Sequence, residues 1–487
     1  MLLRRLIPIL LATLSLAACG GGLAADQPTA PLPTQTPTAA PPARATIALP
    51  PTAAPAPAQA TALRPTSAPA PTQAPAPTPA PTQLPAPTQA PAPTQAPATQ
   101  APAAAALPVA SLGSEILFLR KGALIAFDTG TRKERQIANA VRDFVVSPDG
   151  VLIGLIRGKG RQAEIWTVRR DGSSLTQLTT NDRAEAGLSW APDGGALVYG
   201  SSTATEPYRP EWMTWSAWCV SSEVRLLSLS DSSETSFGSG CDPSFSPDGK
   251  RIAYATPPTQ YEPDLNKGPT IVNSIRLINR EGQHGWDFAK AQGADAPPPH
   301  TGRIVYAPAW SPDGKQIVYH RFLGYQALVD LDLTEIAGSF DGKGKPLDSG
   351  AGWLLPARFA PNGQSVAISE NNEGDARGFG GYDNWAVVVT NLGGEHEIAL
   401  PSGALTAVGQ RADRLPRAQA AAWAPDGAAL AVELPPGWNP GLTPDQPVNA
   451  DGQPGEIWRW RPGSAPEQLL VKGADFASPL AWLPPSQ

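Results

Sequence analysis

The sequence is poor in the side chains that build most catalytic and metal centres. It holds three cysteines, four histidines and two methionines in 487 residues, which leaves little material for a metal cluster. No basic stripe accompanies the net charge of −6, so nucleic acid is not an expected partner. A Gly-x-Ser-x-Gly segment is also missing, and with it the nucleophile elbow of an α/β-hydrolase.

Long apolar runs are missing after the first few residues. Leu6 to Leu16 follow the charged pair Arg4 and Arg5, and this run is too short for a stable membrane span but is typical of an export signal. Leu16-Ala17-Ala18-Cys19 then resembles the lipobox of bacterial lipoproteins. The resemblance implies a signal peptide at residues 1–18 and a lipidated Cys19. The alternatives are an ordinary secretory signal or an N-terminal anchor helix.

Proline, in contrast, is abundant, and 25 of the 57 prolines are concentrated in the first quarter of the chain. Ala80-Pro81-Thr82-Gln83 recurs almost unchanged at residues 86–89 and 92–95. Such a composition cannot bury a core and favours extended polyproline II structure. We therefore predict a disordered spacer at residues 19–111, with a contour of up to about 270 Å.

One short module organises the rest of the chain. Trp310-Ser311-Pro312-Asp313-Gly314 precedes the apolar run Ile317-Val318-Tyr319, and proline, aspartate and glycine in this order predict a tight turn between two strands. The same turn recurs, each time one place after Val, Phe or Trp, at residues 147–150, 191–194, 246–249, 360–363 and 424–427.

Each turn belongs to a unit of about 45 to 65 residues with four short strands, which we call a, b, c and d. Around Ser147 the expected strands are 143–146, 151–156, 164–168 and 175–178. Around Ser311 they are 307–310, 316–320, 327–331 and a weak, loop-like last strand. Four strands per repeat are typical of a propeller blade, with the large residue before the turn packed between neighbouring blades.

The two ends of the repeat region complete one another. Residues 115–119, 123–127 and 135–137 read as strands b, c and d without a strand a, whereas residues 478–484 read as a lone strand a. We therefore predict an all-β, seven-bladed β-propeller over residues 112–487, closed by the C-terminal strand, with six or eight blades as alternatives.

These turns resemble the WD40-like Asp-Pro repeats of the TolB propeller family. The resemblance covers about residues 112–487 and is carried by the Trp/Phe-Ser/Ala-Pro-Asp/Asn-Gly motif. It implies that strand a of each blade lines a central channel, and that the protein is an extracytoplasmic scaffold for protein partners. The chain departs from TolB in lacking its N-terminal α/β domain.

The insertions all fall on one side of the expected propeller. The a–b and c–d turns are short, the c–d set including residues 392–394. The b–c and d–a segments are long, at residues 200–222, 256–271, 288–305, 370–384, 401–418 and 434–455. Long irregular loops often carry function. We expect an aromatic binding face there, formed by Tyr208, Trp212, Trp215, Trp218, Tyr261, Tyr382, Trp385 and Trp438. The alternative is that these rings are the cores of the loops.

The remaining reactive side chains are few. Cys219 and Cys241 suit a disulfide across one c–d hairpin in an exported protein, with two free buried cysteines as the alternative. His300 and His320 lie near the insertion side, and some TolB-like propellers resemble metal-dependent oligogalacturonate lyases that use histidine ligands. Two histidines without a matching motif are more typical of solvated loops, so we predict no metal, cofactor or catalytic residue.

The expected function is therefore binding. We predict a lipoprotein, anchored to the bacterial membrane outside the cytoplasm, whose propeller binds an envelope protein or a glycan through its long loops. Two alternatives stay open: a metal-dependent polysaccharide lyase or another propeller enzyme, and a structural module of an envelope complex.

Overall fold

A computed structural model describes residues 112–204, 212–261, 270–290, 304–322, 328–335, 345–351, 353–371, 382–399, 405–439, 441 and 453–486. The chain divides into two compact units, Met1–Thr99 and Gln100–Gln487, and the described residues all belong to the second. The predicted signal peptide and spacer lie outside them. No helix in the described ranges is long and apolar enough to cross a membrane.

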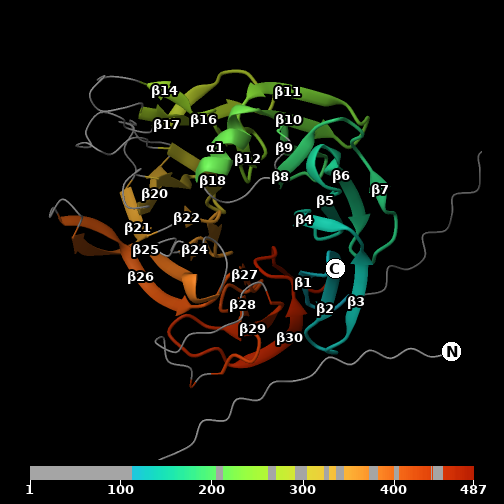
Figure 1. Cartoon of the computed structure of the whole chain (residues 1–487), viewed down its shortest axis with the longest axis vertical. Coiled ribbons are helices and arrows are strands. Elements are labelled where there is room, and N and C mark those ends of the chain that lie inside the picture. The colour runs from blue at the N-terminus through green and yellow to red at the C-terminus, as the bar shows by residue number, and fades with distance from the viewer. Residues whose placement is uncertain are drawn as a thin grey trace, which may run out of the picture. The chain divides into compact units, whose positions relative to one another are not determined.

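The second unit is a β-propeller, with antiparallel sheets arranged in a ring around a central axis (Figure 1). Six sheets have four strands each, one has five, and one is a separate two-stranded hairpin. We name each large sheet after its first strand in the chain.

Five of the four-stranded sheets are continuous along the sequence. Their strands are β4 (Val141–Val146), β5 (Leu152–Arg157), β6 (Glu164–Arg169) and β7 (Thr176–Gln177); β8 (Ala184–Trp190), β9 (Ala196–Ser202), β10 (Ser222–Ser228) and β11 (Glu234–Ser239); β12 (Cys241–Phe245), β13 (Arg251–Ala255), β16 (Ser274–Asn279) and β17 (Trp286–Lys290); β18 (Ile304–Trp310), β19 (Gln316–Phe322), β20 (Leu328–Glu335) and β21 (Lys345–Ala351); and β27 (Ala421–Trp423), β28 (Leu430–Leu434), β29 (Gly455–Trp460) and β30 (Gln468–Ala474). The last strand of the β18 sheet, β21, is thus a regular strand and not the loop-like segment that the sequence indicated.

The sixth four-stranded sheet joins the two ends of the propeller. It contains β1 (Glu115–Arg120), β2 (Ala123–Asp128), β3 (Glu134–Ala138) and the C-terminal β31 (Ala481–Leu483). β31 pairs antiparallel with β1, so that Leu117 lies opposite Ala481 and Glu115 opposite Leu483. The predicted closure of the first sheet by the last strand is confirmed.

The seventh sheet departs from the regular pattern. Its strands are β22 (Trp353–Leu354), β23 (Arg358–Phe359), β24 (Ser365–Asn371), β25 (Trp385–Ala399) and β26 (Leu405–Pro416). Both β22 and β23 pair with β24, because the inner strand is interrupted around Pro356, which has no backbone N–H for the ladder. The prediction of seven four-stranded blades is therefore corrected: six blades are four-stranded, and the seventh sheet has five strands.

The same sheet corrects a predicted turn and a predicted connection. Residues 392–394, expected as a c–d turn, lie inside β25, where the register shifts between Asn391 and Glu395. Residues 405–416, expected in a d–a connection, form β26 instead. The β25–β26 hairpin is therefore long, and it extends outward from the ring in Figure 1.

The recurring turns stack on one another around the ring. In the turn at Ser311, the Gly314 N–H donates to the Ser311 carbonyl at 2.9 Å, and the Ser311 hydroxyl donates to Asp313 Oδ1 at 2.6 Å. Gly314 has a φ of +70°, which suits glycine best. A Cβ there would lie 3.6 Å from Pro247 of the preceding turn, an ordinary van der Waals contact, so the positive φ and not the lack of space favours glycine.

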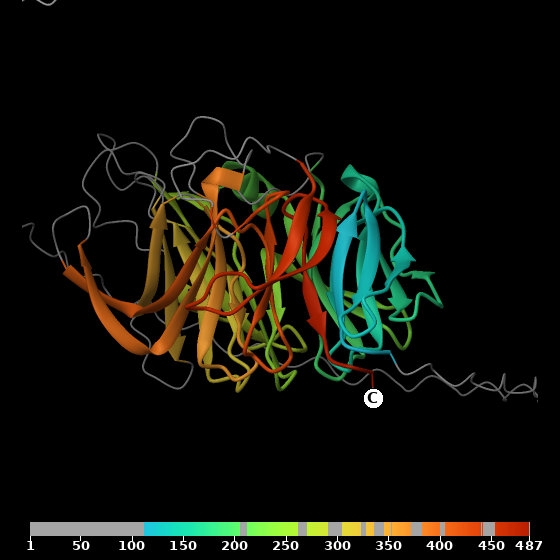
Figure 2. The ribbon, with the colours of Figure 1, turned by 90° about the horizontal axis from the view of Figure 1, so that it is seen from below.

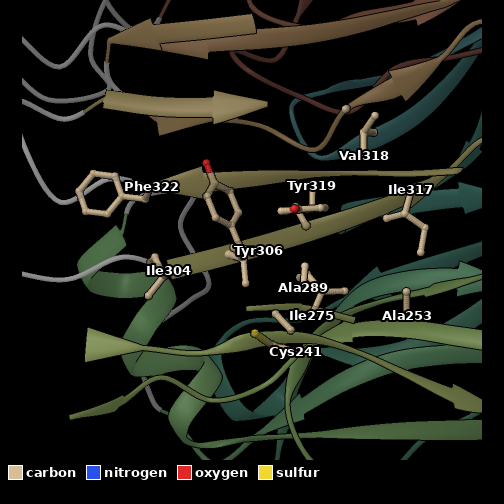
Figure 3. Packing of buried hydrophobic residues seen from close by; sticks show 14 of the residues in the cluster. Cys241, Ala253, Ile275, Ala289, Ile304, Tyr306, Ile317, Val318, Tyr319 and Phe322 are labelled. Atoms are coloured by element: carbon tan, nitrogen blue, oxygen red, sulfur yellow. The ribbon is translucent and has the colours of Figure 1, made fainter. Parts of the chain in front are cut away.

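The large residue before each turn packs between blades, as predicted. Trp310 donates its indole N–H to the carbonyl of Ser244 in the preceding sheet at 3.1 Å, and Trp190 donates to Val145 in the same way at 3.0 Å. Figure 3 shows the apolar core between the β12 and β18 sheets, where Tyr306 and Tyr319 lie near Ile275. Inter-blade packing thus combines apolar burial with a fixed indole hydrogen bond.

The short helices and the added hairpin lie on the side opposite these turns (Figure 2). They are η1 (Gly160–Gln162), α1 (Trp212–Val220), the hairpin β14 (Thr259–Tyr261) and β15 (Thr270–Val272), and η2 (Tyr382–Asn384). The first three lie between the second and third strands of their sheets, and η2 lies between β24 and β25. We call this side the insertion face and the other the turn face.

Removing residues 476–487 should lower the melting temperature by roughly 10 °C or more. The truncation deletes β31 and the buried side chains of Leu480 and Leu483, and it leaves β1 as an open edge. Thermal unfolding followed by circular dichroism measures the change, with the exposed Pro485→Ala variant as the control. An unchanged melting curve for the truncated protein would refute closure by the last strand.

Candidate binding site at the central channel

The inner strands of the sheets line a channel with two adjoining cavities toward the insertion face. The larger, of about 640 Å³, is bordered by Trp385, Phe476 and Ser478. The smaller, of about 300 Å³, is bordered by Trp218 and Asp242. Asp143, Pro356 and Arg358 line both cavities. The two cavities therefore meet at a pair of oppositely charged residues.

A further cavity of about 640 Å³ lies on the turn face, lined in part by Val151, Arg170 and Pro484. Its buried cation already has partners, because Arg170 Nε donates to Glu115 Oε2 at 2.8 Å and Arg170 Nη2 donates to the Gly113 carbonyl at 2.8 Å. We attribute this cavity to the junction of the β1 and β4 sheets.

Asp143 and Arg358 are set into walls made mostly of small apolar residues. Asp143 is half-buried in β4, and its carboxylate accepts a hydrogen bond from the Phe144 N–H at 2.8 Å. Burial raises the pKa of Asp143, while the charge of Arg358 opposes that rise. Enclosure by the channel walls lowers the pKa of Arg358, although the residue stays open to solvent in the channel, and the charge of Asp143 opposes this shift. The two charges thus interact across the channel.

The guanidinium of Arg358 is available for binding. Within the described ranges, it forms no ion pair or side-chain hydrogen bond, although the Arg358 carbonyl accepts the indole N–H of Trp423 at 2.9 Å. Its side chain is exposed to the channel. An arginine surrounded by protein walls, with free donors, is suited to an anionic or strongly polar ligand.

Asp242 shapes the second cavity. Its Oδ2 accepts hydrogen bonds from the Trp215 indole N–H at 2.7 Å and from the Ala307 N–H at 3.2 Å. Its φ is +51°, a conformation that aspartate and asparagine tolerate better than most residues. Burial raises its pKa to about 6, against the opposing effect of these two hydrogen bonds. Asp242 thereby fixes α1 against the inner strands of the β12 and β18 sheets.

The aromatic residues expected on the insertion face lie mainly inside it. Trp215 and Tyr382 are fully buried, and Trp218 and Trp385 are 3% and 2% exposed. Trp215 lies 5.7 Å from Tyr306 between ring centroids, and Tyr382 lies 5.1 Å from Phe476. These rings are the cores of the loops, which is the alternative that the sequence left open. Trp218 and Trp385 also form cavity walls.

The other candidates of that set divide into two groups. Trp438 is half-buried and packs edge-on against Trp458, with ring centroids 5.1 Å apart. Tyr208 lies outside the described residues. Trp212 begins α1 and Tyr261 ends β14, but their side chains lie outside the described part of the structure.

Asp143, Asp242 and Arg358 were not identified as channel residues from the sequence, although their positions in the repeat mark them. Asp143 and Asp242 each stand three residues before the large residue of a turn module, and Arg358 stands one residue before Phe359. The other inner strands carry uncharged residues at these positions, such as Ala307, Ala420 and Ser244. A charged residue inside strand a is therefore the pattern that identifies a channel-lining group.

Cys219 and Cys241 form a disulfide, but it does not cross a hairpin within one sheet as expected. Cys219 lies in α1, and Cys241 is the first residue of β12, the inner strand of the next sheet. The reason is that Gly240 alone separates β11 from β12. The bond closes a loop of 22 residues and contributes about 3 kcal/mol in the chain-entropy model. It links the insertion face to the channel wall.

His320 is not among the residues that line the two channel cavities. His320 in β19 is fully buried, its Nε2 lies 2.8 Å from the Leu355 carbonyl, and its ring lies 5.0 Å from that of Tyr306. Burial lowers the pKa of His320 to about 3. His300 lies outside the described residues. Across the described ranges, no three histidine, cysteine or acidic side chains form a metal-binding group.

Solved structures with a similar fold include TolB from Acinetobacter baumannii, at 13% identity over 76% of this chain and 82% of that one, with a TM-score of 0.37. They also include an oligogalacturonate lyase in complex with manganese, at 14% identity over 64% and 79%, with a TM-score of 0.42. A functionally unknown protein from Desulfotomaculum acetoxidans is 12% identical over 77% and 99%, with a TM-score of 0.44. No family model and no curated protein matches the sequence. The site is therefore interpreted from its own residues.

The burial of Asp242 should make stability depend on pH. Because its folded-state pKa of about 6 exceeds the ordinary value of 3.8, its contribution is greatest below pH 4 and is lost as the pH rises through 6. Between pH 4 and 7, the wild type should lose up to about 3 kcal/mol of unfolding free energy relative to Asp242→Asn. Urea unfolding at several pH values measures this difference.

The exposed turn residue Asp248 provides a control of opposite sign. Its hydrogen bond from Ser246 lowers its pKa, so its contribution is present above the ordinary value and is lost as the pH falls. Asn362 occupies the matching place in another turn, so Asp248→Asn should fold. Parallel pH profiles for wild type and Asp242→Asn would contradict the assignment.

Proposed function

We propose that the protein is an extracytoplasmic lipoprotein whose propeller binds an envelope protein or a glycan at the insertion-face end of its channel. The observation that carries this proposal is the guanidinium of Arg358, which has no hydrogen-bond or ion-pair partner among the described residues and stands with Asp143 where two cavities meet. The proposal keeps the binding face expected from the sequence but moves its centre from the loop aromatics to the channel.

The chemistry of the cavities favours a polar ligand with an acidic group. Arg358 can donate two parallel hydrogen bonds to a carboxylate. Asp143 can accept from a hydroxyl or an ammonium group at the same junction. The walls beside them, including Leu355 and Phe476, are apolar, and such a mixture of apolar walls with few polar groups is typical of ligand pockets. Acidic side chains of a protein and uronic acids of a glycan both meet this description.

The surroundings of the channel support the same face. The short helices η1 and α1 lie between the second and third strands of their sheets and η2 lies between β24 and β25, and loop segments carried by a rigid scaffold are frequent binding elements. The Cys219–Cys241 disulfide holds α1 beside the smaller cavity. The mouth is thus built on covalently and sterically fixed groups, which limits the ordering cost of binding.

Membrane attachment is tested through Cys19. A Cys19→Ser variant should lose incorporation of a labelled fatty acid, and in a fractionated bacterial host it should move from the membrane to the soluble exported fraction. Wild-type protein gives the comparison, and Cys219→Ser controls for loss of an unrelated cysteine. Equal labelling of wild type and Cys19→Ser would refute the lipoprotein assignment.

Ligand binding is tested by reversing the channel charge. Arg358→Glu should weaken binding to isolated envelope proteins or cell-wall glycan by about tenfold or more, because a charge-assisted hydrogen bond contributes about 1.5–3 kcal/mol. Lys133→Glu makes the same charge change at an exposed turn-face residue and should leave binding unchanged. Co-sedimentation with glycan and crosslinked pull-down from native envelopes measure the two partner classes separately.

Point variants are preferable to shortened loops. Residues 200–222 contain Trp215 and Cys219, which are fully buried, so shortening that segment would damage the core. Equal binding by wild type and Arg358→Glu would contradict the proposed site and favour a purely structural module.

A further inference from the structure

A second polar cluster lies between the β4 and β8 sheets, away from the channel charges. Glu164 begins β6, Glu185 is the second residue of β8, and Asn181 lies in the connection between the two sheets. The Glu185 N–H donates to the Ala163 carbonyl at 3.0 Å, which fixes β8 beside the end of the neighbouring sheet. The cluster is therefore part of a junction between blades.

Asn181 joins the two carboxylates. Its backbone N–H donates to Glu164 Oε1 at 2.8 Å, and its side-chain Nδ2 donates to Glu185 Oε1 at 2.9 Å. Thr179 donates its hydroxyl to the other oxygen, Glu164 Oε2, at 2.6 Å. These bonds hold the two acidic groups near one asparagine while leaving one oxygen of Glu185 and the oxygen of Asn181 unused.

The two unused oxygens are buried. Glu185 is 2% exposed, and neither its Oε2 nor Asn181 Oδ1 has a hydrogen-bond partner in the described part of the chain. Both atoms are acceptors. A buried acceptor without a donor is unfavourable, and more so when it is charged, so a positively charged or donating group would stabilise the arrangement.

Arg183, the cationic residue between Asn181 and Glu185 in the sequence, is already committed. Arg183 donates through Nε to Ser201 Oγ at 2.8 Å and through Nη2 to the Ser201 carbonyl at 2.7 Å. Ser201 then donates to Glu185 Oε1, not to Oε2, at 3.2 Å. The protein therefore supplies no counter-ion to Glu185 Oε2 within the described ranges.

We propose that this junction binds one calcium ion, with Glu185 Oε2, Asn181 Oδ1 and a Glu164 oxygen as its protein ligands and water as the remainder. Carboxylate and amide oxygens are the ligands of a hard cation, and calcium tolerates irregular geometry better than magnesium does. The ion would offset the charge of the buried carboxylates and tie the connection at Asn181 to both sheets. The half-buried Asn181 and the exposed Asp182 beside it leave a route from solvent.

The test is calcium binding to the full chain after removal of metal with a chelator. Isothermal titration with calcium chloride should give one ion per chain, and the melting temperature should rise by roughly 3–6 °C at a calcium concentration 100-fold above Kd. Magnesium chloride at the same concentration should give a smaller rise. Glu185→Gln should abolish both signals, because it removes the charge and replaces one ligand oxygen with an amide.

Two further variants keep the test decisive. Asp182→Asn removes an acidic group from the same connection but from its exposed side, and it should bind calcium as the wild type does. Asn181→Ala should weaken calcium binding at least tenfold. This variant replaces Glu185→Gln in the test if Glu185→Gln fails to fold. Absence of calcium binding by the wild type, or equal binding by wild type, Glu185→Gln and Asn181→Ala, would overturn the proposal.

Discussion

The pairing of β31 with β1 is the constraint on which the rest of the propeller depends. It joins residues at opposite ends of the described chain, with Leu117 opposite Ala481. Asp475 strengthens the same junction, because its two carboxylate oxygens accept the N–H groups of Lys121 and Gly122 at 2.6 and 2.8 Å. Without this closure, the first and last sheets would each expose an edge and a face. Closing the ring lets every sheet bury both faces against its neighbours.

Closure also shapes the proposed binding site, because it turns the inner strands toward a common axis. The C-terminal residues 476–480 border the larger cavity, so the segment that closes the ring also walls the channel. The interrupted inner strand at Pro356 places Arg358 at the junction of both cavities. The sheet that departs from the regular four-stranded blade thus also contains Arg358, the residue that we propose binds the ligand.

Much of this architecture was predictable from the sequence, since the turn module combines local chemistry with spacing. Proline, aspartate and glycine dictate the turn, and the residue before it, such as Trp310, must pack between blades. The two incomplete ends predicted the closing strand. The five-stranded sheet was not predictable in the same way, because Pro356 interrupts pairing only once the strand is in place.

The site was predicted less well than the fold. Trp215 and Tyr382 sit in long polar segments, where sequence alone does not distinguish an exposed ring from the core of a loop. Their burial depends on tertiary partners such as Asp242 and Phe476. The sequence places the disulfide within one hairpin, because nothing in it marks Gly240 as the boundary between β11 and β12. The cluster of Glu164, Asn181 and Glu185 depends on contacts across two sheets, which no local pattern reveals.

The most direct measurement of the central claim is site-specific photo-crosslinking in intact cells. A photoreactive amino acid at Leu355, a half-buried residue that lines the larger cavity, is compared with one at Lys315, whose side chain is 81% exposed in a turn on the other face. We expect a discrete crosslinked adduct from position 355 and none from position 315. Adducts from position 315 alone would contradict ligand binding at the channel mouth.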